Sequence, residues 1–70
     1  MLNNFEYWND KLNKIEYDVL TKFHTPRLLG YRLGYFASNI SHAYYEGALK
    51  FDEYKSLCIR SDEIYMNIKD

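Results

Sequence analysis

The chain has 70 residues, of which 47% are hydrophobic and 27% charged, as is typical of one small globular domain spanning residues 1–70. Nine Lys and Arg against ten Asp and Glu leave a net charge of -1, which argues against a polybasic nucleic-acid binder and against an acidic mimic of DNA. The single cysteine, Cys58, excludes an internal disulfide. We expect no metal and no other cofactor, because the sequence has neither a spaced Cys/His set nor a phosphate-binding glycine loop.

No apolar stretch approaches the roughly 18 residues that span a bilayer, and the N-terminus lacks the features of a signal peptide. A cytoplasmic protein is therefore expected. Residue types with AT-rich codons number 31 against 10 with GC-rich codons, which favours the genome of a low-GC bacterium or of one of its phages or plasmids. The small size also leaves dimerisation open as a way to complete the fold.

Apolar residues at steps of three and four predict a first helix over about residues 4–23, with Asn3 or Asn4 as its cap. We place Trp8 in the core of the domain, with the seam of a dimer as the alternative. The core stripe of this helix consists of Phe5, Trp8, Leu12, Ile15, Val19 and Phe23.

A second helix is predicted over about residues 26–46, because Pro26 suits the first turn of a helix and Thr25 can cap it. Gly47 stands where a left-handed residue would end this helix, with the apolar Leu49 just beyond. Its core stripe is Leu29, Leu33, Phe36, Ile40 and Ala43. A second face of small residues predicts the close approach of another helix or of a bulky ring, and comprises Gly30, Gly34, Ala37, Ser41 and Ala48.

A third helix is predicted over about residues 51–68, with carboxylates in its first turn. Short linkers make consecutive helices antiparallel, so the fold class is an all-α three-helix unit. Residues 45–54 resemble the helical hairpin of short C-terminal (SHOCT-type) domains, and this resemblance implies a local hairpin and no function. The core stripe of the third helix is Tyr54, Leu57, Ser61, Ile64 and Ile68.

The second helix carries a row of aromatic and basic side chains opposite its core stripe, which we call the tyrosine face. Tyrosine offers a large contact area with few rotatable bonds and a hydroxyl for the rim of an interface, so we expect this face to bind a protein partner. The alternative is that the third helix or a second subunit covers these rings. The tyrosine face consists of Arg27, Tyr31, Tyr35, His42 and Tyr45, with Ser38 among them.

Ile59 and Met66 lie seven residues apart and off the core stripe of the third helix. Together with Trp8 they predict a further apolar flank, which a second copy or a partner would cover.

No catalytic function is expected, because neither His24 nor His42 has a nucleophile or carboxylate at a spacing that forms a dyad. The function that these features favour is a protein-binding module that occupies the surface of a larger protein. With the codon bias, this favours a phage- or mobile-element-encoded inhibitor or regulator of a host protein. The alternatives are a nucleic-acid-binding regulator that uses Arg27, Arg32 and the rings of the tyrosine face, or a self-assembling structural subunit.

Overall fold

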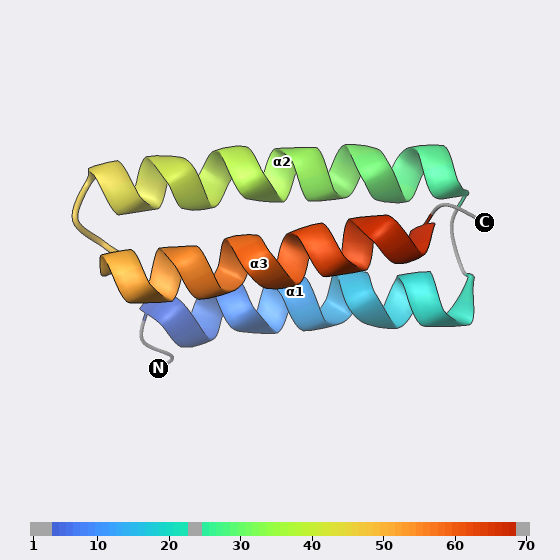
Figure 1. Ribbon diagram of the computed structural model, residues 1–70, viewed down its shortest axis with the longest axis horizontal. Coiled ribbons are helices and arrows are strands. Elements are labelled where there is room, and N and C mark those ends of the chain that lie inside the picture. The colour runs from blue at the N-terminus through green and yellow to red at the C-terminus, as the bar shows by residue number, and fades with distance from the viewer. Residues whose placement is uncertain (1–3, 23–24, 69–70) are drawn as a thin grey trace.

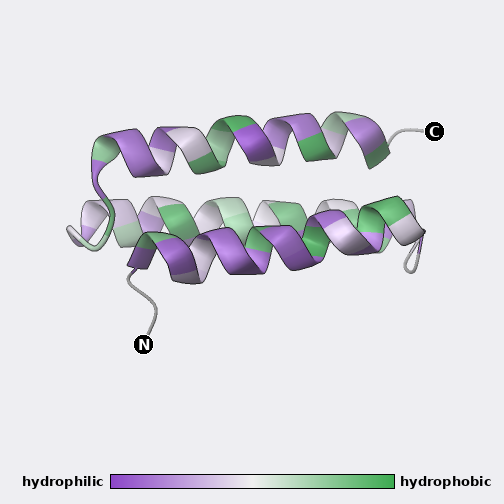
Figure 2. Ribbon diagram, turned by 90° about the horizontal axis from the view of Figure 1, so that it is seen from below, coloured by the Kyte–Doolittle hydropathy of each residue, from purple (hydrophilic) through white to green (hydrophobic). Residues whose placement is uncertain are grey.

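A computed structural model describes residues 4–22 and 25–68. These residues form three helices, α1 (Asn4–Thr21), α2 (Pro26–Tyr45) and α3 (Phe51–Ile68), and contain no strand. Consecutive helices run antiparallel, and α3 lies over the seam between α1 and α2 (Figures 1 and 2). The predicted all-α three-helix unit is therefore confirmed.

Helix α1 ends two residues earlier than predicted, at Thr21. The next residue, Lys22, has a φ of 55° and donates its backbone N–H to the Val19 carbonyl at 3.2 Å. A residue in this left-handed conformation stops the α-helical hydrogen-bond pattern. The prediction of Asn3 as a cap and of Phe23 as a core residue falls outside the described residues.

Both predicted ends of α2 are found, although its last helical residue is Tyr45 rather than residue 46. The Thr25 hydroxyl accepts a hydrogen bond from the Leu28 N–H at 3.2 Å, which caps the first turn. At the other end, Gly47 has a φ of 83° and donates to the Tyr44 carbonyl at 3.0 Å, while Ala48 donates to Ala43 at 2.9 Å. These two bonds are the Schellman arrangement that the glycine predicted.

Helix α3 begins and ends as predicted, but its first turn is capped by the Glu53 carboxylate rather than by a Ser or Thr hydroxyl. The residue before the helix is Lys50, and its N–H donates to the Glu53 carboxylate at 3.0 Å. This bond is the half of a capping box in which the third helical residue reaches back. The Asp52 and Glu53 carboxylates also lie at the positive end of the helix dipole.

The core lies between the three predicted stripes. All five stripe residues of α2 are buried, whereas the ends of the other stripes, such as Phe5 and Ile68, are only partly covered. Leu49 in the linker before α3 is buried as well, which anchors the α2–α3 hairpin to the core. The buried residues that α1 and α3 contribute are Leu12, Ile15, Leu57, Ser61 and Ile64.

The small-residue face of α2 packs more loosely than predicted. A Cβ on Gly30 would lie 3.7 Å from the Tyr65 ring, so here a bulky side chain does approach the helix. Nothing lies within 4 Å of the corresponding position on Gly34, and Ala37 is exposed. The prediction of a close approach along the whole face was wrong at these two residues, because no neighbouring side chain fills the space beside Gly34 and Ala37 remains exposed.

Candidate functional site

The tyrosine face is exposed. The side chains of Tyr31, Tyr35 and Tyr45 are 81%, 74% and 82% exposed, and Arg27 and His42 are exposed too. Because the opposite face of α2 is buried along its length, the backbone that presents these rings is held by the core. Neither α3 nor α1 covers the rings, so the alternative of burial within one chain does not hold.

The tyrosine face spreads around α2 rather than forming one straight row. Tyr35 and His42 lie on the side toward α1, where they line hollows with α1 side chains. The Tyr45 ring centroid is 5.8 Å from that of Tyr44, whose ring in turn stacks on Tyr54 of α3. His42 also lies 3.1 Å from the Glu46 carboxylate, one turn further along α2, so the expectation that no carboxylate is spaced to pair with His42 was wrong. The face therefore borders two neighbouring helices, with Tyr31 between them.

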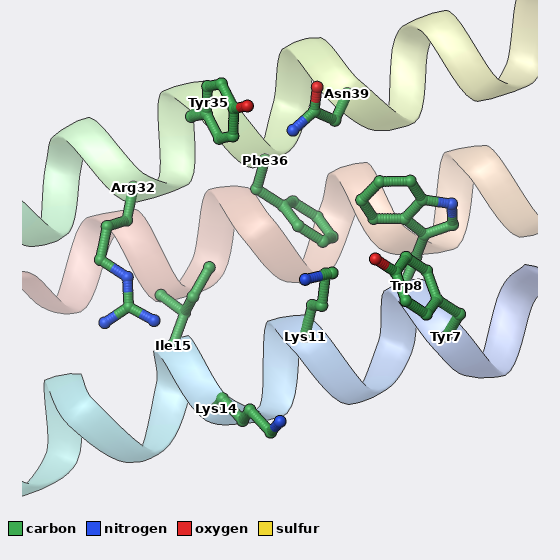
Figure 3. Close-up of a pocket in the computed structure, with 9 residues that line it drawn as sticks. All are labelled: Tyr7, Trp8, Lys11, Lys14, Ile15, Arg32, Tyr35, Phe36 and Asn39. Atoms are coloured by element: carbon green, nitrogen blue, oxygen red, sulfur yellow. The ribbon is translucent and has the colours of Figure 1, made fainter.

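A groove of about 380 Å³ runs between α1 and α2, on the side of the bundle away from α3 (Figure 3). Its floor is apolar and consists of Trp8, Ile15 and Phe36. The Trp8 and Phe36 rings meet edge to face with centroids 6.0 Å apart, an arrangement that aromatic pairs favour. We call this hollow the α1/α2 groove.

The rim of the α1/α2 groove is basic and polar. Its cations are Lys11 and Lys14 from α1 and Arg32 from α2, and no carboxylate lines it. The Lys11 ammonium lies 5.0 Å from the centroid of the Tyr7 ring, and Lys14 lies 3.7 Å from the exposed Asp10 carboxylate. The remaining lining residues are Tyr7, Tyr35 and Asn39.

Two arginines tie α1 to its neighbours. Arg32 donates to the Asp18 carboxylate at 2.5 Å and closes the end of the seam between α1 and α2. Arg60 of α3 donates to three α1 side chains, the carbonyl oxygens of Asn9 and Asn13 at 2.6 and 2.8 Å and the Glu16 carboxylate at 3.0 Å. Because Arg32 already binds an internal carboxylate, it is a weaker phosphate ligand than the nucleic-acid alternative requires.

An aromatic cluster lies where α2 meets α3. The Tyr44 and Tyr54 rings stack with centroids 4.8 Å apart, and Phe51 lies 6.0 Å from Tyr44. A side-chain hydrogen bond with Cys58 raises the pKa of the Tyr54 hydroxyl above its ordinary value of 10.0. Cys58 is half-buried beside the core, as its position next to the stripe predicted.

The predicted flank of Trp8, Ile59 and Met66 is not one surface. Trp8 is half-buried and packs against the core at the floor of the α1/α2 groove. Ile59 and Met66 are 50% and 73% exposed and lie on the outer side of α3, away from that groove. The structure thus separates these residues onto opposite sides of the bundle.

His24 lies outside the described residues, so the structure does not place it. Within residues 4–22 and 25–68, no group of three or more His, Cys, Asp and Glu side chains could hold a metal ion. None of the helices in this part of the chain is long and apolar enough to cross a bilayer.

No protein-family model matches the chain, and no curated protein or solved structure matches it. Sequence reasoning identified the exposed residues of α2 but missed the groove beside them. A signal was present, because Tyr7, Lys11 and Lys14 recur at steps of four and three next to the core stripe of α1.

Proposed function

We propose that this chain is a noncatalytic protein-binding module that occupies the surface of a larger protein through the tyrosine face of α2. The observation that carries the proposal is the exposure of Tyr31, Tyr35 and Tyr45, each at least 74%, on a helix whose other side is buried. Rings held in this way lose little conformational freedom on binding, and such rings dominate many protein interfaces. With the AT-rich codon usage, this favours a phage or mobile-element product that inhibits or regulates a host protein.

The partner is expected to be a protein rather than a nucleic acid. The net charge is -1, and Arg32, the arginine nearest the middle of α2, is bonded to Asp18. A nucleic-acid ligand would need several unpaired cations, and its binding would weaken steeply as salt rises. The tyrosine face contributes only Arg27 as a permanent cation.

The test is affinity capture of partners from a lysate of the source cell or its host, with and without nuclease, using matched variants. We expect one stoichiometric protein that resists nuclease and is lost from the double variant Tyr31→Ala, Tyr45→Ala. The control is Tyr17→Ala, which removes an exposed ring of α1 outside the tyrosine face. Equal capture by wild type and the double variant would contradict the proposal, and a partner set that disappears with nuclease would favour the nucleic-acid alternative.

A further inference from the structure

The α1/α2 groove has the chemistry of a site for an acidic, apolar helix. Its floor is apolar, and its lining includes Lys11 and Lys14 but no carboxylate, while the third cation, Arg32, is already bound to Asp18. The floor residues Trp8 and Ile15 are seven residues apart on α1, which is two helical turns or about 10 Å. A helix that docks into such a groove would present apolar anchors at matching spacing, with carboxylates beside them.

The outer face of α3 has this pattern on the opposite side of the same molecule. Ile59 and Met66 are also seven residues apart, and they are 50% and 73% exposed. The side chains beside them are the exposed carboxylates of Asp52, Asp62 and Glu63, with Lys55 as a cation in the same row. We call this set the α3 ridge. It is apolar at its centre and predominantly acidic at its edges.

From these two faces we infer that the chain associates head to tail, with the α3 ridge of one copy seated in the α1/α2 groove of the next. Ile59 and Met66 then cover the floor between Trp8 and Ile15, and the ridge carboxylates meet Lys11 and Lys14. The apolar contact is made mainly with Trp8, because Ile15 and Phe36 are already buried in the core, and the opposite charges set the orientation and the register.

The position of the two faces determines the kind of assembly. The groove opens on the side away from α3 (Figure 3), and the ridge points away from the core, which α3 shares with α1 and α2. Two copies related by a two-fold axis therefore cannot each seat their α3 ridge in the α1/α2 groove of the other. Each added copy leaves one groove and one ridge unused, so association continues into an open chain or closes as a ring.

The experiment measures mass by sedimentation equilibrium for wild type and for two variants that each disable one face. The groove variant is Lys11→Glu, Lys14→Glu, and the ridge variant is Ile59→Lys, Met66→Lys. All four side chains except that of Ile59 are largely exposed, and Ile59 is half exposed, so circular dichroism is expected to show unchanged helicity. Wild type is expected to grow beyond a dimer with concentration, and each variant alone to associate at least roughly tenfold more weakly.

An equimolar mixture of the two variants supplies the decisive result. The groove variant keeps an intact ridge and the ridge variant keeps an intact groove, so the mixture is expected to form a 1:1 dimer and nothing larger. The control variant Lys22→Glu, Lys50→Glu changes the net charge equally at positions outside the groove lining and is expected to assemble like wild type.

Three outcomes would overturn the inference: a monomeric wild type at all concentrations, a mixture that stays monomeric, or a wild-type dimer that neither variant disturbs. None of them bears on the proposed partner binding, because Tyr31 and Tyr45 belong neither to the groove lining nor to the α3 ridge. The two proposals therefore fail separately.

Discussion

Helix α1 meets α3 along one seam and α2 along another, and the two seams differ in what they leave exposed. Toward α3, the guanidinium of Arg60 reaches Asn9, Asn13 and Glu16, which succeed one another about one turn apart on α1. Toward α2, Arg32 binds Asp18 at one end, and the α1/α2 groove lies next to this ion pair along the seam. The seam toward α3 is closed by hydrogen bonds between facing side chains. The seam toward α2 stays open because lysines and aromatic rings face each other there.

This contrast separates residues that hold the fold from residues that are available to a ligand. The Asn and Glu partners of Arg60 each accept a hydrogen bond that holds α3 against α1. Lys11 and Tyr35 line a hollow and bind nothing of comparable strength within the structure. The α3 side of α1 is therefore structural, whereas the α2 side carries the candidate binding surface.

The largest expected effect comes from the core residue that supports both seams. Leu12 of α1 is fully buried, and Leu12→Ala would leave a cavity beneath the two neighbouring helices. We expect the free energy of unfolding to fall by about 2–5 kcal/mol, a large part of the stability of so small a domain. Urea denaturation followed by circular dichroism measures this loss. A loss below that of Arg60→Ala would show that the bundle does not depend on this core position.

The next largest loss of stability is expected when either of the two arginines that bind α1 is removed. Arg60→Ala removes three hydrogen bonds from the α1/α3 seam and is expected to cost about 1–2 kcal/mol, whereas Arg32→Ala removes one ion pair and is expected to cost about 1 kcal/mol or less. Urea midpoints of both variants check the order. If Arg32→Ala proved the more costly, the seam toward α2 would be the structural one.

The third seam, between α2 and α3, can be tested at two glycines. Gly34→Ala is expected to stabilise the protein by about 0.5–1 kcal/mol, because nothing lies within 4 Å of the new methyl group and alanine favours the helix. Gly30→Ala places its methyl 3.7 Å from the Tyr65 ring, which is ordinary van der Waals contact, so we expect at least an equal gain there. Thermal melting of both variants measures the two gains, and a clearly smaller gain at Gly30 would mean that the Tyr65 ring restricts this surface of α2.

The smallest effect on stability is expected for an exposed ring at the α1/α2 groove. Tyr35→Ala removes a ring that is 74% exposed, and the free energy of unfolding is expected to change by less than about 0.5 kcal/mol. Binding of the captured partner is expected to weaken clearly, because Tyr35 belongs to the tyrosine face. A large fall in melting temperature would instead place this ring among the structural residues.

The spacing of apolar residues predicted the three helices closely, because the pattern of an amphipathic helix depends only on residues that are near one another in the sequence. The 3.6-residue repeat identified the buried stripe of α2, Thr25 marked the start of that helix, and Gly47 marked its end. The end of α1 was predicted two residues late, because the left-handed conformation of Lys22 has no sequence signal as strong as a glycine. The exposure of the tyrosine face followed from the same periodicity, since these residues lie opposite the buried stripe.

The amino-acid sequence by itself determined which side of each helix is buried, since that depends only on the spacing of apolar residues along one chain. Only the tertiary structure decided which exposed sides face one another. Lys11 and Lys14 join the tyrosine face at one groove, whereas Trp8 and Met66 lie on opposite sides of the bundle. The physical reason is that a helical wheel gives directions around one axis, while a groove depends on how two axes pack and on which seam the third helix covers.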